Sequence, residues 1–225
     1  MARDRVGEPN PTKFLREAGR AALEPLGVTL RGRGRNWVDD RGWWIVNVEF
    51  QPSGWSKGSY LNAGVQFLWK PFPGHSFEFG DRVRLRSGDK SVQFIEYQNE
   101  MQFREAAREL ATVAAREVLA YRKLFATLGA CVKALRKEEA LYRYHLGVAY
   151  GLAGKKKDAA RLIDAAHVRR EPRDWEIEQN HLLDELSSLV GDTPAFQARI
   201  LDMVNVQRRT LKLPDDLPVD LPRTM

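Results

Sequence analysis

The chain of 225 residues contains one cysteine, Cys131, and no long hydrophobic run. A single cysteine excludes an intramolecular disulfide and a zinc site built from several cysteines. No window approaches the roughly 20 apolar residues that a membrane-spanning helix needs. The first residues lead into no apolar segment of the kind that a signal peptide carries. We therefore expect a cytoplasmic protein without a membrane partner.

Motifs typical of enzymes and metal sites are also missing. The four histidines form no His-x-x-x-His or His-Glu-x-x-His pattern. Glu178, His181 and Glu185 share one side of a predicted helix, but a di-metal bundle needs a second such motif, and the sequence has none. Residues 154–157, Gly-Lys-Lys-Lys, lack the first Gly and the Ser/Thr of a phosphate-binding loop. We predict no catalytic residues, no metal and no cofactor.

The net charge of +6 is unevenly distributed along the chain. Residues 99–170 hold 15 Lys/Arg against 8 Asp/Glu, whereas residues 171–225 hold 6 against 11. A basic middle followed by an acidic end can neutralise itself within one fold. The high pI is therefore weak support for nucleic-acid binding.

The first hundred residues change from a helical period to a period of two. A helix is expected after Asn10, with Gly27 as its C-terminal cap. Alternating strands are then expected at 28–30, 36–38, 43–51, 59–69, 82–86 and 91–98. Short turn-like links between strands are typical of an antiparallel meander with one buried face.

From Asn99 onward the apolar residues recur at helical spacing. We expect one long helix that begins at residue 99 and extends beyond residue 118, and further helices at 124–135, 174–190 and 193–211. Residues 142–172 carry the spacing of a tetratricopeptide repeat: Leu146-Gly147-x-x-Tyr150, then Gly154, Ala159, Ile163, Ala166 and Pro172. Because only one copy is present, a plain helical hairpin remains an equal alternative.

We predict an α+β fold: an antiparallel β-meander packed on helices, with an all-helical C-terminal extension. The first unit is residues 1–98, the N-terminal helix plus the sheet. The second is residues 99–225, helical, packed on the sheet and including the hairpin at 142–172. The alternative is one continuous domain.

A stretch of this sequence resembles a bacterial family, the domain-of-unknown-function family 4304. The resemblance covers roughly residues 10–130 and rests on Leu26-Gly27-Val28-x-Leu30-Arg31-Gly32-Arg33, Asn47-Val48-Glu49-Phe50-Gln51 and Asn62-Ala63-Gly64-Val65. It implies an α+β fold, without an established activity and without catalytic residues to carry over.

The polar face of the predicted sheet and the loop beside it form the candidate partner-binding surface. Its residues are Glu49, Gln51, Trp55, Asn62, Gln66 and Arg84. The alternative interpretation is cross-strand Glu–Arg pairing and solvation, in which each pair stabilises by about 0.2–1 kcal/mol. Trp55 either folds back on the sheet edge or serves as an exposed anchor.

These observations favour a non-enzymatic module whose partner is another protein. The alternative is a nucleic-acid-binding protein that uses basic sheet and helix surfaces. A third reading is an enzyme of unknown class in which Glu49 acts as an acid or base, although no partner group can be assigned. The sequence does not specify the oligomeric state.

Overall fold

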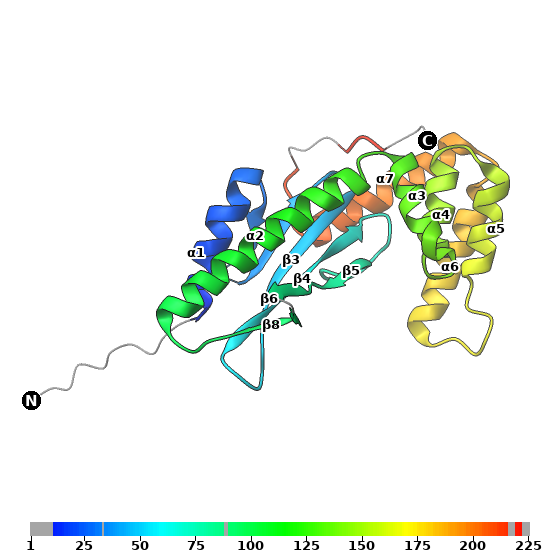
Figure 1. The fold of residues 1–225 in the computed structure, drawn as a ribbon. Coiled ribbons are helices and arrows are strands. Elements are labelled where there is room, and N and C mark those ends of the chain that lie inside the picture. Colours follow the sequence, from blue (N-terminus) through cyan, green and yellow to red (C-terminus); the bar gives the residue numbers. More distant parts are fainter. Residues whose placement is uncertain (1–10, 33, 88–89, 216–218, 222–225) are drawn as a thin grey trace, which may run out of the picture. The chain divides into compact units, whose positions relative to one another are not determined.

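The computed structural model describes residues 11–32, 34–87, 90–215 and 219–221 (Figure 1). It has the predicted α+β fold, with an antiparallel sheet and a helical C-terminal part. The chain divides into two compact units, which are described separately. Of the described residues, the sheet unit contains those up to Arg41, those from 45 to 66 and those from 76 to 121. The helical unit contains the described residues in 42–44, in 67–75 and from Arg122 onward.

The main sheet has six strands, of which the first five follow chain order and the sixth pairs with the fourth. The strands are β1 (Thr29–Leu30), β2 (Asn36–Asp40), β3 (Trp44–Pro52), β4 (Gly58–Phe67), β5 (Phe79–Arg82) and β8 (Phe94–Glu96). Strand β8 does not extend the meander, because it returns to pair with the start of β4, where Tyr60 lies opposite Phe94. The sheet is therefore a five-strand meander with one returning strand.

Two of the expected strands are broken in the structure. The segment expected as one strand over 82–86 divides between the end of β5 and β6 (Leu85–Ser87). The segment expected over 91–98 divides between β7 (Lys90–Val92) and β8. Strands β6 and β7 pair with each other in a separate two-stranded sheet. Alternation alone indicates extended chain but not which neighbour it pairs with.

The apolar face of the sheet is buried, as the alternation predicts. Val46, Val48 and Val65 are fully buried. Helices α1 (Pro11–Leu23) and α2 (Glu100–Leu124) lie on the same side of the sheet (Figure 1). The two helices touch through Phe14 and Phe103, whose ring centroids are 6.4 Å apart.

Helix α1 approaches the sheet closely because residue 19 is a glycine. A Cβ atom there would lie 2.8 Å from the Trp37 ring and 3.1 Å from the Phe50 ring. At the other end of the sheet, the Tyr121 hydroxyl of α2 donates to the carbonyl oxygen of Ala63 over 3.1 Å. After α1, a 3₁₀ turn (η1, Glu24–Leu26) ends at Gly27, which has the left-handed φ of 77° predicted for a C-terminal cap.

The helical unit is built from consecutive helices joined by short links. They are α3 (Leu128–Leu135), a 3₁₀ turn (η2, Arg136–Glu138), α4 (Glu139–Leu152), α5 (Lys156–Ala166), α6 (Asp174–Leu189) and α7 (Thr193–Thr210). Helix α4 packs against α3, α5 and α7, and α6 packs against α5 and α7. Helices α4 to α7 thus surround a common core.

The predicted hairpin is present as α4 and α5. A Cβ atom at Gly147 would lie 2.8 Å from Cγ1 of Ile163, so the two helices touch at the small residue, as the spacing predicts. Gly154 occupies the turn with a φ of 68°, a conformation that L side chains rarely adopt.

Two details of the helical part differ from the sequence prediction. The helix expected at 124–135 begins at Leu128, because the Thr127 hydroxyl accepts a hydrogen bond from the Ala130 amide and caps it. Trp175 and Ile177 belong to the helix expected at 174–190 from the helical spacing of its apolar residues, but they are 55% and 39% exposed. The Leu183 and Leu186 face of α6 is the buried one.

Candidate functional site

Three of the predicted binding residues belong to one hydrogen-bonded cluster on the polar face of the sheet. The Asn62 amide nitrogen donates to Oε2 of Glu49 and to Oε1 of Gln51, each over 2.9 Å. Arg82 completes the cluster, donating to Oδ1 of Asn62 over 3.3 Å and to Oε1 of Gln51 over 2.7 Å. These side chains bond to each other across the strands through the amide groups of Asn62 and Gln51, whereas the alternative interpretation expected Glu–Arg pairs.

An aromatic pair extends this cluster toward the edge of the sheet. The Arg82 guanidinium lies 4.0 Å from the centroid of the Tyr60 ring. Tyr60 in turn packs on Phe94 of β8, with ring centroids 4.8 Å apart. A cation above an aromatic face is stabilising, so this contact fixes Arg82 further.

Gln66 lies on the same face of the sheet but is covered. Its side chain is fully buried. Its Oε1 accepts hydrogen bonds from the Asn47 side chain and from the Ser76 amide, each over 3.1 Å. The Asn47 amide also donates to the Ser76 carbonyl oxygen over 2.7 Å. The segment that contains Ser76 closes this end of the polar face, which the sequence had led us to expect in solvent.

Trp55 and Arg84 lie outside the cluster and are exposed. Trp55 is 98% exposed, in a loop where the Ser53 hydroxyl accepts from the amides of Trp55 and Ser56. The loop borders a hollow of about 410 Å³ that also includes Arg35. Trp55 therefore does not fold back on the sheet edge, and its role as an anchor stays a prediction.

A larger cleft, missed by the sequence analysis, lies within the helical unit. Its volume is about 690 Å³. Its apolar lining comes from Pro71, Phe72, Pro73, Tyr144, Trp175 and Leu182. Its polar lining comes from Lys70, Glu178, Gln179, His181, Glu185 and Arg199. Concave, mostly apolar sites with a few polar groups are typical of ligand binding.

Phe72 lies in a loop whose backbone is hydrogen-bonded to a buried side chain of α7. The Phe72 amide donates to Oε1 of Gln207 over 3.1 Å, and Nε2 of Gln207 donates to the Phe72 carbonyl over 2.7 Å. Gln207, on α7, is buried, whereas the Phe72 side chain is 43% exposed. Pro71 and Pro73 restrict φ on either side of Phe72. The backbone at Phe72 is thus held in place, while the phenyl ring remains accessible.

The backbone that carries Trp175, at the first turn of α6, is also held by hydrogen bonds. The buried Glu176 carboxylate accepts from the Arg173 amide over 2.9 Å and from the Arg170 guanidinium over 2.7 Å. The hydrogen bond from the Arg173 amide lowers the pKa of Glu176, and the neighbouring arginines add to the effect. This capping arrangement sets the start of the helix on which Trp175 lies.

The charges of the cleft are partly neutralised by each other. Arg199 forms two hydrogen bonds to the Glu185 carboxylate, of 2.6 and 2.9 Å, and a third to Asp202 of 3.0 Å. The hydrogen bond to Arg199 lowers the pKa of Glu185. Glu178 and Gln179 have no side-chain partner within the described part of the chain.

Glu178, His181 and Glu185, considered above as metal ligands, do line one cleft. Among the described residues, however, no group of three His, Cys, Asp or Glu side chains is arranged to hold a metal ion.

The sequence did contain one signal for the cleft. The spacing of Trp175, Gln179, Leu182 and Glu185 places these four lining residues on one face of a helix.

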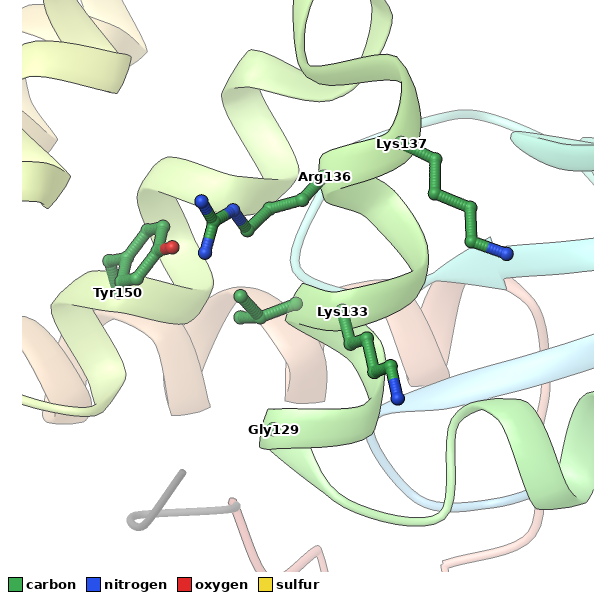
Figure 2. Close-up of a pocket in the computed structure, with 6 residues that line it drawn as sticks. Gly129, Lys133, Arg136, Lys137 and Tyr150 are labelled. Atoms are coloured by element: carbon green, nitrogen blue, oxygen red, sulfur yellow. The ribbon is translucent and has the colours of Figure 1, made fainter.

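A second, shallower groove of about 600 Å³ lies between α3 and α4. Its lining includes Lys133, Arg136, Lys137 and Tyr150. Figure 2 shows that Arg136 extends across the groove toward Tyr150, whereas the two lysines point away from it. The three cations therefore do not converge on one point.

The buried Cys131 does not resemble a catalytic nucleophile. Burial raises the pKa of its thiol strongly, and the thiol rather than the reactive thiolate is then present at neutral pH.

Comparisons with known proteins do not identify the chain. No protein-family model, curated protein or solved structure matches it. The resemblance to the domain-of-unknown-function family 4304 therefore stays a prediction. Among the described helices, none is long and apolar enough to cross a membrane.

Proposed function

We propose that this chain is a non-enzymatic protein-binding module that holds an extended segment of a partner in the cleft of the helical unit. The observation that carries the proposal is the pair of accessible aromatic side chains, Phe72 and Trp175, at one cleft, each on a backbone segment held by hydrogen bonds. Large aromatic residues in a well-formed pocket contribute a disproportionate share of binding energy in protein interfaces.

The hydrogen-bonded backbone beneath the two aromatic residues favours a binding role over a structural one. A partner loses affinity when loops must be ordered on binding. Here Gln207 holds the backbone of the loop that carries Phe72, and the Glu176 cap holds the turn that carries Trp175. Both rings are left partly exposed, at a cost in solvation that contact with a partner would recover.

Selection from a displayed library of random peptides tests the proposal. The immobilised full chain is the target, and the variants Trp175→Ala and Phe72→Ala are used as parallel targets. We expect peptides that bind the parent chain and lose about tenfold or more in affinity for either variant. Circular dichroism should confirm that both variants are folded, since neither side chain is buried.

Trp55→Ala provides the matched control, because Trp55 is an exposed tryptophan of the sheet unit. Selected peptides should bind this variant as they bind the parent chain. Peptides that depend on Trp55 but not on Trp175 would contradict the cleft proposal and would support the surface predicted from the sequence. An absence of any selected peptide would contradict both.

The groove shown in Figure 2 favours a second candidate, binding of single-stranded nucleic acid. Arg136 is exposed and extends across the groove toward Tyr150, whose ring can stack with a base. Anisotropy with labelled RNA and DNA oligomers at about 50 mM salt tests it. Affinity that falls with salt and is lost in Arg136→Ala would support this function, and no binding would exclude it.

A further inference from the structure

Resting on the proposed function, we infer that the segment bound in this cleft is an uncharged, proline-rich stretch in the polyproline II conformation. The inference depends on three properties of the cleft: its flat aromatic walls, its balanced charge, and the kind of hydrogen-bonding group that it leaves free. Each restricts the class of peptide that fits.

The walls suit proline rings. Phe72 and Trp175 each present part of a flat ring, and Leu182 adds apolar surface between polar positions. Proline-rich segments are recognised in grooves lined by aromatic residues, where the preformed polyproline II helix loses little entropy on binding. A cleft of about 690 Å³ accepts a few residues of such a segment.

The formal charges that line the cleft disfavour a strongly charged peptide as its ligand. The formal charges of Lys70 and Arg199 balance those of Glu178 and Glu185. A cation stacked on the indole is also disfavoured, because the chain's own Arg173 guanidinium already lies 5.6 Å from the Trp175 ring centroid. An uncharged peptide meets no net repulsion in the cleft and brings no cation that would compete with Arg173 for the indole.

The backbone of the loop at residues 71–73 has no free amide hydrogen with which a β-strand of a partner could pair. Pro71 and Pro73 have no amide hydrogen, and both backbone polar groups of Phe72 are occupied by Gln207. The half-buried Gln179 side chain has an amide without a partner among the described residues. Because polyproline II has no internal hydrogen bonds, its carbonyl groups are free to accept from such a donor.

Fluorescence anisotropy of the full chain with a labelled oligoproline peptide of about ten residues tests the inference directly. We expect saturable binding that weakens about tenfold or more in Trp175→Ala and in Phe72→Ala. Removal of one hydrogen bond in Gln179→Ala should weaken it by about threefold to tenfold. Trp175→Phe, which keeps a flat ring, should retain most of the affinity.

Two peptides of equal length act as controls: one of alternating Gly and Ser, and one in which alternate prolines are replaced by Lys. Both should bind more weakly than oligoproline, and Trp55→Ala should bind oligoproline like the parent chain. Tighter binding of the lysine-containing peptide, or equal binding of the Gly-Ser peptide, would overturn the inference.

The library selection separates failure of this inference from failure of the proposed function. Selected peptides without proline that still need Trp175 would leave the function standing and overturn the proline preference. If neither library peptides nor oligoproline bind in a manner that depends on Trp175, both the function and the inference are wrong.

Discussion

Nε1 of Trp69 donates a hydrogen bond of 3.0 Å to Nδ1 of His145 in the buried interior of the helical unit. Because Nδ1 accepts, the proton of the neutral imidazole must be on Nε2. The ring of Trp69 also stacks on Trp43, with centroids 4.8 Å apart. The hydroxyl of Tyr144 donates to the Trp69 carbonyl over 2.8 Å. A neutral histidine is thus part of the core packing.

This histidine should make stability depend on pH. Burial lowers the pKa of His145 well below its usual value, and the positive charge of Lys70 adds to the shift. At a pH below about 6.5 the unfolded chain binds a proton that the folded chain does not. The free energy of unfolding should therefore fall as the pH decreases from neutral through that value.

Urea unfolding at several pH values between about 5 and 7.5 measures this effect. In His145→Gln the titrating group is removed while an acceptor for Trp69 is retained, so the loss of stability at acidic pH should be smaller. An equal pH dependence in the parent chain and in His145→Gln would show that the buried imidazole is not its source.

Gly147 allows α4 and α5 to touch, and a larger residue should separate them. In Gly147→Ala the new methyl group would lie 2.8 Å from Cγ1 of Ile163 and 3.3 Å from its backbone nitrogen. Overpacking costs about 1–3 kcal/mol and opposes the gain of about 1 kcal/mol in helix propensity. We expect a net decrease in the free energy of unfolding.

A second substitution distinguishes crowding from other causes. Ile163→Ala removes the atom that the methyl group would meet. Gly147→Ala should therefore be less destabilising in the Ile163→Ala background than in the parent chain, as a double-mutant cycle would measure. Additive effects of the two substitutions would argue against the close contact.

Gln207 should affect peptide binding although it does not line the cleft. Gln207→Leu removes both hydrogen bonds that hold Phe72, so the loop should become mobile and oligoproline affinity should fall. Hydrogen exchange at the Phe72 amide should become faster. Gln207→Glu keeps an acceptor for that amide and should recover part of the protection. Unchanged exchange and unchanged affinity in Gln207→Leu would contradict the positioning role.

The polar cluster of the sheet unit should contribute stability. Asn62→Ala removes hydrogen bonds to Glu49, Gln51 and Arg82, and leaving such polar groups without their partner costs about 1–3 kcal/mol. Arg84→Ala is the control, because Arg84 is exposed and should change stability by less than about 0.5 kcal/mol. Thermal unfolding of both variants checks the comparison, and equal effects would contradict it.

Local patterns in the sequence determined most of the helices and strands, and they determined which side β3 and β4 bury. The alternation along β3 and β4 identified Val46, Val48 and Val65 as interior, because successive side chains of a strand point to opposite faces. The hairpin turn at Gly154 and the close contact at Gly147 followed from residue size and backbone freedom. These are properties of neighbouring residues, and the sequence displays them directly.

The cleft was decided by the tertiary structure. Phe72 and Trp175 are far apart in the chain, and no local pattern predicts that Gln207 would hold the loop that carries Phe72. The covering of Gln66 by the Ser76 segment likewise depends on a connection that alternation does not describe. A sequence pattern specifies which face of an element is apolar. Which segments then cover the faces depends on how distant parts of the chain pack together.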